Sequence, residues 1–177
     1  MEYDTRIFLL LNSAQGWGPL DRFFIAMSWL GEGWLIIPLA LALVLMKHGR
    51  TGIRVIAACS LAATFITLLG FALKESVARA RPVAVLGDAV RVLGPRLEAH
   101  SMPSGHSLLV FMILGFLCGV HRRLAWLWLP FAMLVGVSRI YVGAHFPADV
   151  VAGAALGFVP ALSVGLRVGS SLRTEGS

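Results

Sequence analysis

Charged residues are scarce in this sequence. Asp, Glu, Lys and Arg make up 14% of its 177 residues, whereas a typical soluble domain has about 25%. Hydrophobic residues make up 58%, and the mean hydropathy is +0.82. Because a helix needs about 20 apolar residues to cross the hydrocarbon core of a bilayer, the chain has room for several crossings. The composition excludes an ordinary soluble domain and predicts an all-α, polytopic integral membrane helix bundle.

Long polar linkers, low-complexity stretches and internal repeats are also lacking. We therefore expect residues 1–177 to form a single membrane-embedded domain. The two cysteines, Cys59 and Cys118, lie in apolar runs, where free thiols behave as small hydrophobic side chains rather than as a disulfide framework. The acidic N-terminus, with Glu2 and Asp4, lacks the basic region of a cleavable signal peptide. No basic run is typical of a nucleic-acid site, so nucleic acid is not an expected partner.

Glycine, proline and charged residues divide the apolar sequence into predicted helices. The short segment 7–11 suits an interfacial helix or the beginning of a first span. The stretch 22–46 is interrupted by Gly31-Glu32-Gly33, which we interpret as a turn between two shorter helices, with one long helix as the alternative. Pro82 is expected to end the next span, because the residue before a proline avoids the helical region. The clearer predicted spans cover residues 53–80, 104–120, 124–142 and 148–168.

Basic residues cluster at the ends of the apolar stretches, as the positive-inside rule expects of cytoplasmic loops. If the first cluster along the chain, at 47–54, is cytoplasmic, the alternating direction of the predicted spans places the clusters at 122–123 and 167–173 in the cytoplasm as well. The loop 81–103 and the segment 139–149 are then outside. If Gly31–Gly33 is an outer turn, the N-terminus is cytoplasmic and the bundle has about six transmembrane helices. The clusters are Lys47, Arg50 and Arg54; Arg122 and Arg123; and Arg167 and Arg173.

Polar residues from three separate segments should meet at the outer face. A charged group costs about 2.5–3.5 kcal/mol at mid-bilayer on insertion scales, so it is rarely present without a role. The first segment contains Lys74 and Arg81, whose seven-residue separation places them near one face of a helix. Two cations on one stripe can bind an anion with at least two charges. The alternative is that such cations snorkel to lipid headgroups, a role that suits Arg79 better.

The second segment, Ser104-Gly105-His106, opens a predicted apolar helix. Serine is a preferred N-cap, and the exposed N–H groups of a first helical turn form an anion site. Gly105 allows a ligand to approach the backbone closely, and His106 can donate a proton to a leaving oxygen. The alternative is a capped helix start with an incidental histidine.

The third segment contains Arg139, His145 and Asp149, with Pro147 as an early residue of the last helix. Asp149 follows His145 by four residues, close enough to accept a hydrogen bond from one ring nitrogen. That bond would fix the tautomer and leave the other nitrogen as a nucleophile. A purely structural polar cap is the alternative, but it does not account for the arginine.

Together these segments resemble the three-part signature of the type 2 phosphatidic acid phosphatase family. The matching patterns are K-x6-R-P at 74–82, P-S-G-H at 103–106 and S-R-x5-H-x3-D at 138–149. Every defined position is filled, in the order and helix placement of the family. The resemblance covers residues 74–149 directly, and the flanking spans suit the six-helix membrane members. Related soluble haloperoxidases share a similar anion pocket, but this chain is far too apolar to be one of them.

The resemblance implies a lipid phosphatase that works through a phosphohistidine intermediate. His145 would be the nucleophile, oriented by Asp149, while His106 would protonate the leaving oxygen and then activate water. The spacing of the residues alone does not decide which histidine has which role. The phosphate would be bound by Lys74, Arg81, Ser104, Gly105 and Arg139.

No cofactor and no metal ion is expected, because three cations supply the charge that a metal ion supplies elsewhere. Asp88, Glu98 and His100 are expected to be solvated loop residues rather than metal ligands. Two other classes of function stay open: a transporter, in which charged residues mark an ion path, and a catalytically dead lipid-binding protein. The sequence lacks the inverted repeat and the paired broken helices of many transporters, and no signature position is missing.

The small size and short loops resemble bacterial members of the family that act on phosphorylated lipids. By that analogy the expected substrate is undecaprenyl diphosphate, with the 1-phosphate of lipid A or phosphatidylglycerol phosphate as alternatives. We expect an enzyme of the bacterial inner membrane whose active site faces the periplasm. There it could recycle an isoprenyl carrier after its cargo has been transferred.

Overall fold

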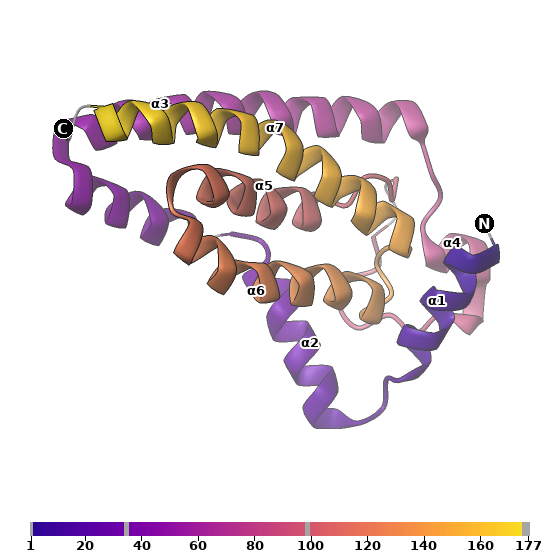
Figure 1. Cartoon of the computed structure of the whole chain (residues 1–177). Helices are drawn as coiled ribbons and strands as arrows, with labels where there is room; N and C mark the ends of the chain where they lie inside the picture. The colour runs from indigo at the N-terminus through magenta and orange to yellow at the C-terminus, as the bar shows by residue number, and fades with distance from the viewer. Residues whose placement is uncertain (1, 34–35, 98–99, 175–177) are drawn as a thin grey trace.

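A bundle of α-helices forms the molecule (Figure 1). The computed structural model describes residues 2–33, 36–97 and 100–174, and its description of side chains excludes positions 36, 38–51 and 172–174. No strand occurs in these ranges. The predicted all-α membrane bundle is confirmed. The helices are α1 (Glu2–Ser13), α2 (Gly18–Leu30), α3 (Ile36–Val77), α4 (Pro82–Leu86), the 3-10 helix η1 (Gly87–Ala89), α5 (Gly105–Val120), α6 (Arg122–Tyr141) and α7 (Pro147–Thr174).

Several helices are long and apolar enough to cross a bilayer. Within the described residues, the segments Gly52–Ala89, Arg122–Tyr141 and Pro147–Ser171 meet this criterion, and α5 is a shorter apolar helix. Large apolar side chains on these helices are widely exposed, among them Phe65 on α3 and Leu127 on α6. Such surface is stable in lipid but not in water. The chain is therefore an integral membrane protein, as its composition predicts.

The core of the bundle is the contact between α5 and α7, which lie side by side with α3 and α6 on their flanks (Figure 1). Glycines allow the two backbones to touch. A Cβ atom on Gly157 of α7 would lie 2.1 Å from the carbonyl oxygen of Leu108, and one on Gly119 of α5 would lie 2.0 Å from the backbone of Gly165. Small residues at helix contacts are the usual basis of close packing in membranes, where no hydrophobic effect drives helices together.

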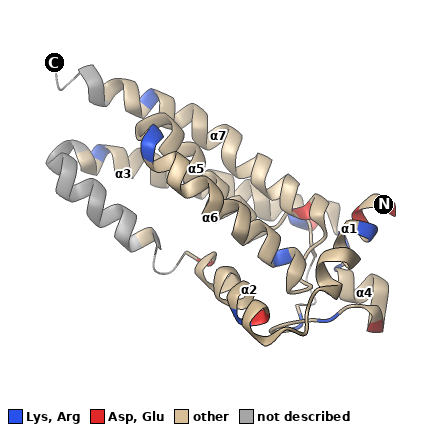
Figure 2. Ribbon diagram, turned by 60° about the horizontal axis from the view of Figure 1, so that its bottom comes forward, with Lys and Arg blue, Asp and Glu red and all other residues tan. Residues whose placement is uncertain are grey.

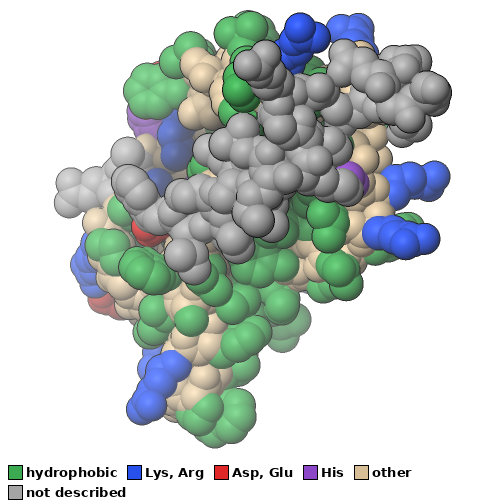
Figure 3. All heavy atoms as spheres, turned by 90° about the vertical axis from the view of Figure 1, so that its left-hand side faces the viewer, with side chains coloured by type: hydrophobic (Ala, Val, Ile, Leu, Met, Phe, Trp, Pro, Cys, Tyr) green, Lys and Arg blue, Asp and Glu red, His purple; other side chains and the backbone are tan. Residues whose placement is uncertain are grey.

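The two ends of the bundle differ in character. The end of α3, the start of α5, the end of α6 and the start of α7 lie together, near α1 and α4 (Figures 1 and 2). The start of α6, with Arg122 and Arg123, and the later part of α7, with Arg167, lie at the opposite end (Figure 1). Viewed from that opposite end, Lys and Arg side chains lie towards the edges of the molecule, and hydrophobic side chains lie between them (Figure 3). The predicted gathering of the three polar segments at one end, away from these arginines, is therefore confirmed.

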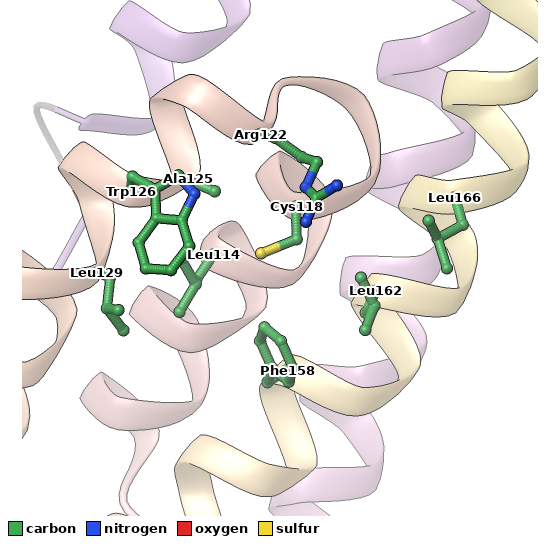
Figure 4. A pocket seen from close by; sticks show the side chains of 9 residues that line it. All are labelled: Leu114, Cys118, Arg122, Ala125, Trp126, Leu129, Phe158, Leu162 and Leu166. Carbon is green, nitrogen blue, oxygen red and sulfur yellow. The ribbon is translucent and has the colours of Figure 1, made fainter.

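An apolar groove of about 480 Å³ opens beside α5, α6 and α7 (Figure 4). Trp126 and Phe158 are among its lining side chains, and Arg122 extends over it beside Cys118. Because its lining residues belong to the second half of α5, the first half of α6 and the middle of α7, the groove lies nearer the basic end than the end with the polar segments.

Two predictions about α3 differ from the structure. We expected a loop at 47–54, but the helix is continuous from Ile36 to Val77. Within it the chain doubles back at the basic end of the bundle (Figure 1). The helix also ends at Val77, so Pro82 is not the residue that terminates it. Ala78 adopts a positive φ of 47°, the left-handed conformation that commonly follows a helix, and Pro82 instead begins α4.

The N-terminal helices lie at the polar end of the bundle (Figure 1), whereas the topology argument placed the N-terminus at the basic end on the condition that Gly31–Gly33 is an outer turn. The side chain of Asn12 donates hydrogen bonds to the carbonyl oxygens of Arg91 and Tyr141, each at 2.9 Å, which fixes α1 against the end of α6. The 12 residues of α1 and the 13 of α2 extend about 18 and 20 Å. An interfacial helix, one of the two predictions for segment 7–11, agrees with this arrangement.

We expect Gly157→Ala to destabilise the protein, because its new methyl group would collide with the carbonyl oxygen of Leu108. Overpacking typically costs about 1–3 kcal/mol. Thermal unfolding in detergent measures the effect, with Gly18→Ala as the control, because a Cβ atom at Gly18 meets nothing within 4 Å. Equal unfolding temperatures for the two variants would contradict the proposed packing.

Candidate active site

The predicted site residues lie on helix ends and on the loops beside them. Lys74 lies in the last turn of α3, and Arg81 is the N-cap residue of α4. Arg139 lies in the last turn of α6, and Asp149 in the first turn of α7. Ser104, Gly105 and His106 begin α5, and His145 lies in the short connection between α6 and α7.

His145 and Asp149 are both buried, with exposed fractions of 2% and 0%. The Oδ2 atom of Asp149 accepts a hydrogen bond from the backbone N–H of Phe146 at 2.9 Å and lies 3.6 Å from Nδ1 of His145. That separation is slightly longer than a hydrogen bond, and Nδ1 has no other hydrogen-bond partner among the described residues. The carboxylate therefore faces the ring nitrogen that the sequence predicts it to orient.

Arg81 lies on the other side of the imidazole. Its Nη1 atom donates to the carbonyl oxygen of Ala144 at 2.8 Å and lies 3.5 Å from Nε2 of His145. Nε2 is the nitrogen that points away from Asp149. A guanidinium beside this nitrogen can bind the oxygens of a phosphoryl group that reacts there.

Lys74 and Arg81 do not share a helix face, because α3 ends at Val77 and the chain turns at Ala78. The prediction of a common helical stripe is therefore wrong. The tertiary structure nevertheless brings Lys74 within electrostatic range of Arg81, Asp149 and Arg139. His106 lies within range of the same cations and of His145.

The start of α5 is held directly against the start of α7. Ser104 is fully buried, and its hydroxyl oxygen accepts hydrogen bonds from the backbone and side chain of Ser107, so the predicted N-cap is confirmed. The backbone N–H of Ser104 donates to the carbonyl oxygen of Asp149 at 2.9 Å. Gly105 is exposed, and a Cβ atom there would meet nothing within 4 Å. A ligand can therefore approach the backbone at this residue.

Arg139 is a buried cation with an exposed fraction of 7%. Its Nη1 atom donates to the hydroxyl group of Ser28 on α2. The turn after α2 also approaches the site, since Oε1 of Glu32 lies 3.9 Å from Nε2 of His106. The sequence prediction assigned neither Ser28 nor Glu32 to the site. The acidic charge of Glu32 within an apolar stretch was the available signal, but we interpreted that segment only as a turn.

Arg79 was expected to snorkel to the headgroups, and this prediction is wrong. Its Nη1 atom donates to Oδ1 of Asp149 at 2.6 Å, and its Nη2 atom donates to Oδ2 of Asp4 on α1. Its guanidinium also lies 4.5 Å from the centre of the Phe146 ring. The side chain is therefore a bridge between the N-terminal helix and the candidate site.

Burial lowers the pKa of His145 to about 4, and the nearby charges of Arg139 and Arg81 act in the same direction against the opposing effect of Asp149. A histidine with this pKa is neutral at pH 7. Neutral imidazole has a lone pair on one ring nitrogen and can attack an electrophile.

Metal ligands are not gathered at this end of the molecule. The residues with described positions contain no group of three or more His, Cys, Asp or Glu that could hold an ion. Of the loop residues considered from the sequence, Nδ1 of His100 lies 3.6 Å from Glu75, and Glu98 is outside the described residues. The expectation of metal-free chemistry stays a prediction.

Comparison with known proteins matches residues 54–168 to the PAP2 superfamily. The chain is 44% identical over 85 residues to the bacitracin transport permease protein BcrC of Bacillus licheniformis, covering 48% of this chain and 41% of that protein. It is 31% identical over 159 residues to the undecaprenyl-diphosphatase of Sulfolobus acidocaldarius, covering 88% of this chain and 73% of that enzyme. The chain thus spans less than half of the first relative and most of the second.

The fold is similar to the crystal structure of Aquifex aeolicus LpxE. The two chains are 32% identical and superpose with a TM-score of 0.77, over 90% of this chain and 93% of the other. The residues matched to the family model, 54–168, include all of the predicted site residues.

We expect His145 to titrate near pH 4 instead of near its ordinary value of about 6.5. The sign follows from burial, which disfavours the charged imidazolium, so the ring stays neutral until the pH falls to about 4. Nuclear magnetic resonance of histidine-labelled protein in detergent measures the titration, with His145→Gln to assign the signal. A midpoint near 6.5 would show that the ring is solvated.

The same arrangement should bind a tetrahedral or five-coordinate oxyanion. Orthovanadate is expected to raise the unfolding temperature, because a ligand present at about 100 times its Kd stabilises the folded state by about 2.7 kcal/mol. Arg139→Met should reduce the shift strongly, whereas Arg123→Met, at the opposite end of the bundle, should not. An equal shift in both variants would place the anion elsewhere.

Proposed function

Because the chain belongs to the PAP2 superfamily, we propose that it is a membrane lipid phosphatase that hydrolyses a phosphate ester or diphosphate of a lipid through a phosphohistidine. The observation that supports this most directly is the environment of His145. Asp149 faces one ring nitrogen at 3.6 Å, and Arg81 lies 3.5 Å from the other. Asp149 can therefore orient the ring through Nδ1, and Nε2 is left to react beside the cation Arg81.

In the proposed first step, Nε2 of His145 attacks the phosphorus atom and the bond from phosphorus to the lipid oxygen breaks. His106 gives its proton to that leaving oxygen. Asp149 stabilises the Nδ1–H group of His145, whose ring gains positive charge as the P–N bond forms. Lys74, Arg81 and Arg139 bind the phosphoryl oxygens, together with the backbone N–H of Gly105.

In the second step, water hydrolyses the phosphohistidine. His106, now neutral, accepts a proton from the water molecule as its oxygen attacks phosphorus. The P–N bond breaks, inorganic phosphate leaves, and His145 returns to its neutral form. Ser104 caps the start of α5 by accepting hydrogen bonds from Ser107, and its own hydroxyl proton donates to a phosphoryl oxygen in the proposed complex. No step requires a metal ion, since three cations surround the transferred group.

A lipid substrate fits the surroundings of the site. A groove of about 220 Å³ runs between α3 and α5, with Leu109 and His121 among its lining residues. Leu109 lies one helical turn after His106, so the groove begins close to the proposed acid and extends towards the other end of α5. Its lining is almost wholly apolar, which suits a hydrocarbon tail held while the headgroup reacts.

Undecaprenyl diphosphate is the proposed substrate. The relative that aligns with 88% of this chain is named an undecaprenyl-diphosphatase. A diphosphate at a lipid end suits a site with several cations, and the same chemistry applies to lipid A 1-phosphate and phosphatidylglycerol phosphate, which are the alternatives. The transport function in the name of the BcrC relative is the competing class, but the polar residues gather at one end of the helices instead of following a path between them.

The proposed orientation places the site outside the cytoplasm, in a bacterial inner membrane. The start of α6, with Arg122 and Arg123, and the later part of α7, with Arg167, lie at the end of the bundle opposite the site (Figure 1), and basic residues favour the cytoplasmic side. A site on the outer surface would act on lipid carriers after their cargo has been transferred.

Purified protein in detergent should release phosphate from one of these lipids. His145→Ala should lower kcat by about a thousandfold or more, because no nucleophile remains, and Arg139→Ala by about 100- to 1,000-fold, because a transition-state cation is lost. The assay compares undecaprenyl diphosphate, phosphatidylglycerol phosphate, lipid A and phosphatidic acid.

EDTA should leave turnover unchanged in this assay, and acid-labile phosphohistidine should be trapped on the wild type but not on His145→Ala. Undiminished activity in His145→Ala would refute the assigned nucleophile. Strong inhibition by EDTA would refute the metal-free mechanism, and release from none of the lipids would refute the proposed substrate class.

A further inference from the structure

Arg79 binds two carboxylates from opposite ends of the chain. It donates to Oδ1 of Asp149 at 2.6 Å and to Oδ2 of Asp4. Its side chain is 20% exposed, while that of Asp149 is fully buried. An ionised carboxylate removed from water requires compensating charge or hydrogen bonds. Arg79 supplies both, although it is not among the residues that the signature motifs define.

Two nearby arginines in the segment between α3 and α4 have different partners. After the left-handed turn at Ala78, the segment leaves the helix and is fixed by Ser101, whose backbone N–H donates to the carbonyl oxygen of Arg79 at 2.8 Å. In this segment Nη1 of Arg81 donates to the carbonyl oxygen of Ala144, beside His145, whereas Nη1 of Arg79 donates to Oδ1 of Asp149.

Because Arg79 binds one oxygen of Asp149, the two oxygens of this carboxylate have different partners. Oδ1 accepts from Arg79, whereas Oδ2 accepts from the backbone of Phe146 and faces Nδ1 of His145. With Oδ1 held, the carboxylate plane is fixed and Oδ2 stays directed at the imidazole. A carboxylate without this partner could rotate towards other cations of the site.

Asp4 in turn holds Arg79. Its Oδ1 atom accepts from the backbone N–H of Ala148 at 2.8 Å, in the first turn of α7, while Oδ2 accepts from Arg79. Acidic groups are favoured at helix N-termini, where N–H groups lack partners within the helix. Asp4 thus connects α1 both to the helix that contains Asp149 and to the arginine that orients it.

We propose that Arg79 is a positioning residue that keeps Asp149 directed at His145, and that Asp4 of α1 holds Arg79 in place for this purpose. The proposal rests on the proposed phosphatase function, because it assigns Arg79 a role in the activity of that same site. Arg79 acts through Asp149 and does not touch the substrate. Its loss should therefore slow the chemical step and leave lipid binding nearly unchanged.

The variants Arg79→Met, Arg79→Lys and Asp4→Asn test this role. Arg6→Met is the matched control, since Arg6 also lies near Asp4 on α1 but is exposed and pairs with Glu2. For each folded variant, kcat and KM are measured on a lipid that the wild type hydrolyses. Unfolding temperature with and without orthovanadate reports folding and the anion site. Nitrogen chemical shifts of His145 report its tautomer.

Arg79→Met should lower kcat by about 10- to 100-fold, the cost seen when hydrogen-bonding partners of metal ligands are removed, with KM changed by less than about threefold. Arg79→Lys should restore part of the activity, because it keeps one charged donor. Asp4→Asn should have a smaller effect, and combining it with Arg79→Met should add little further loss, as expected for residues that act as one unit. The vanadate-induced stabilisation should persist in all of them.

A kcat for Arg79→Met equal to that of Arg6→Met would overturn the proposal. A raised KM with unchanged kcat would also overturn it, because Arg79 would then bind the lipid headgroup. If Arg79→Met does not fold, Asp4→Asn is the test instead. An unchanged kcat in that variant would refute the positioning role of Arg79.

The tautomer measurement separates this proposal from the proposed function. A wild type that hydrolyses no lipid would refute the function. In that case, a loss of the Nδ1–H tautomer of His145 in Arg79→Met but not in Arg6→Met would still support the positioning role. An unchanged tautomer in both variants would refute it.

Discussion

The contact between α5 and α7 is the constraint on which the rest of the molecule depends. Glycines on both helices bring the backbones into contact, and the contact continues to the polar end, where a Cβ atom on Gly153 would lie 2.4 Å from the carbonyl oxygen of Ser104. At that end the N–H of Ser104 donates to the carbonyl oxygen of Asp149. The start of α5, with its available amides, therefore lies against the start of α7, with its carboxylate. Larger side chains along this contact would separate the two halves of the site.

The polar end of the bundle is a set of paired charges built on helix ends. Asp149 is surrounded by Arg79, the N–H of Phe146 and His145, and Arg139 is held by Ser28 of the short helix α2. Such groups can be buried because each has a partner or faces the region where an anion would bind. The short helices α1 and α2 are thereby part of the site, although they lie far from its signature motifs in sequence.

Much of the fold and of the candidate site could be predicted from the sequence. The spans of α5 and α6 follow from apolar runs, and the placement of basic residues at one end follows from the charge pattern. The N-cap at Ser104 follows from residue type. The end of α3 could not be predicted from Pro82, because the chain turns first at Ala78. That conformation depends on tertiary contacts, among them the bonds from Ser101 to the same segment.

By itself the sequence determined that the chain enters a membrane, where α5, α6 and α7 run, and which residue types gather at one end, because hydropathy and motif spacing are local properties. Only the tertiary structure decided how Lys74 and Arg81 meet without sharing a helix, and that Arg79 pairs with Asp4 and Asp149 instead of reaching the headgroups. The physical reason is that an ion pair between positions separated by 70 or more residues depends on how helices pack. No local pattern in the sequence specifies that residues so far apart along the chain form an ion pair.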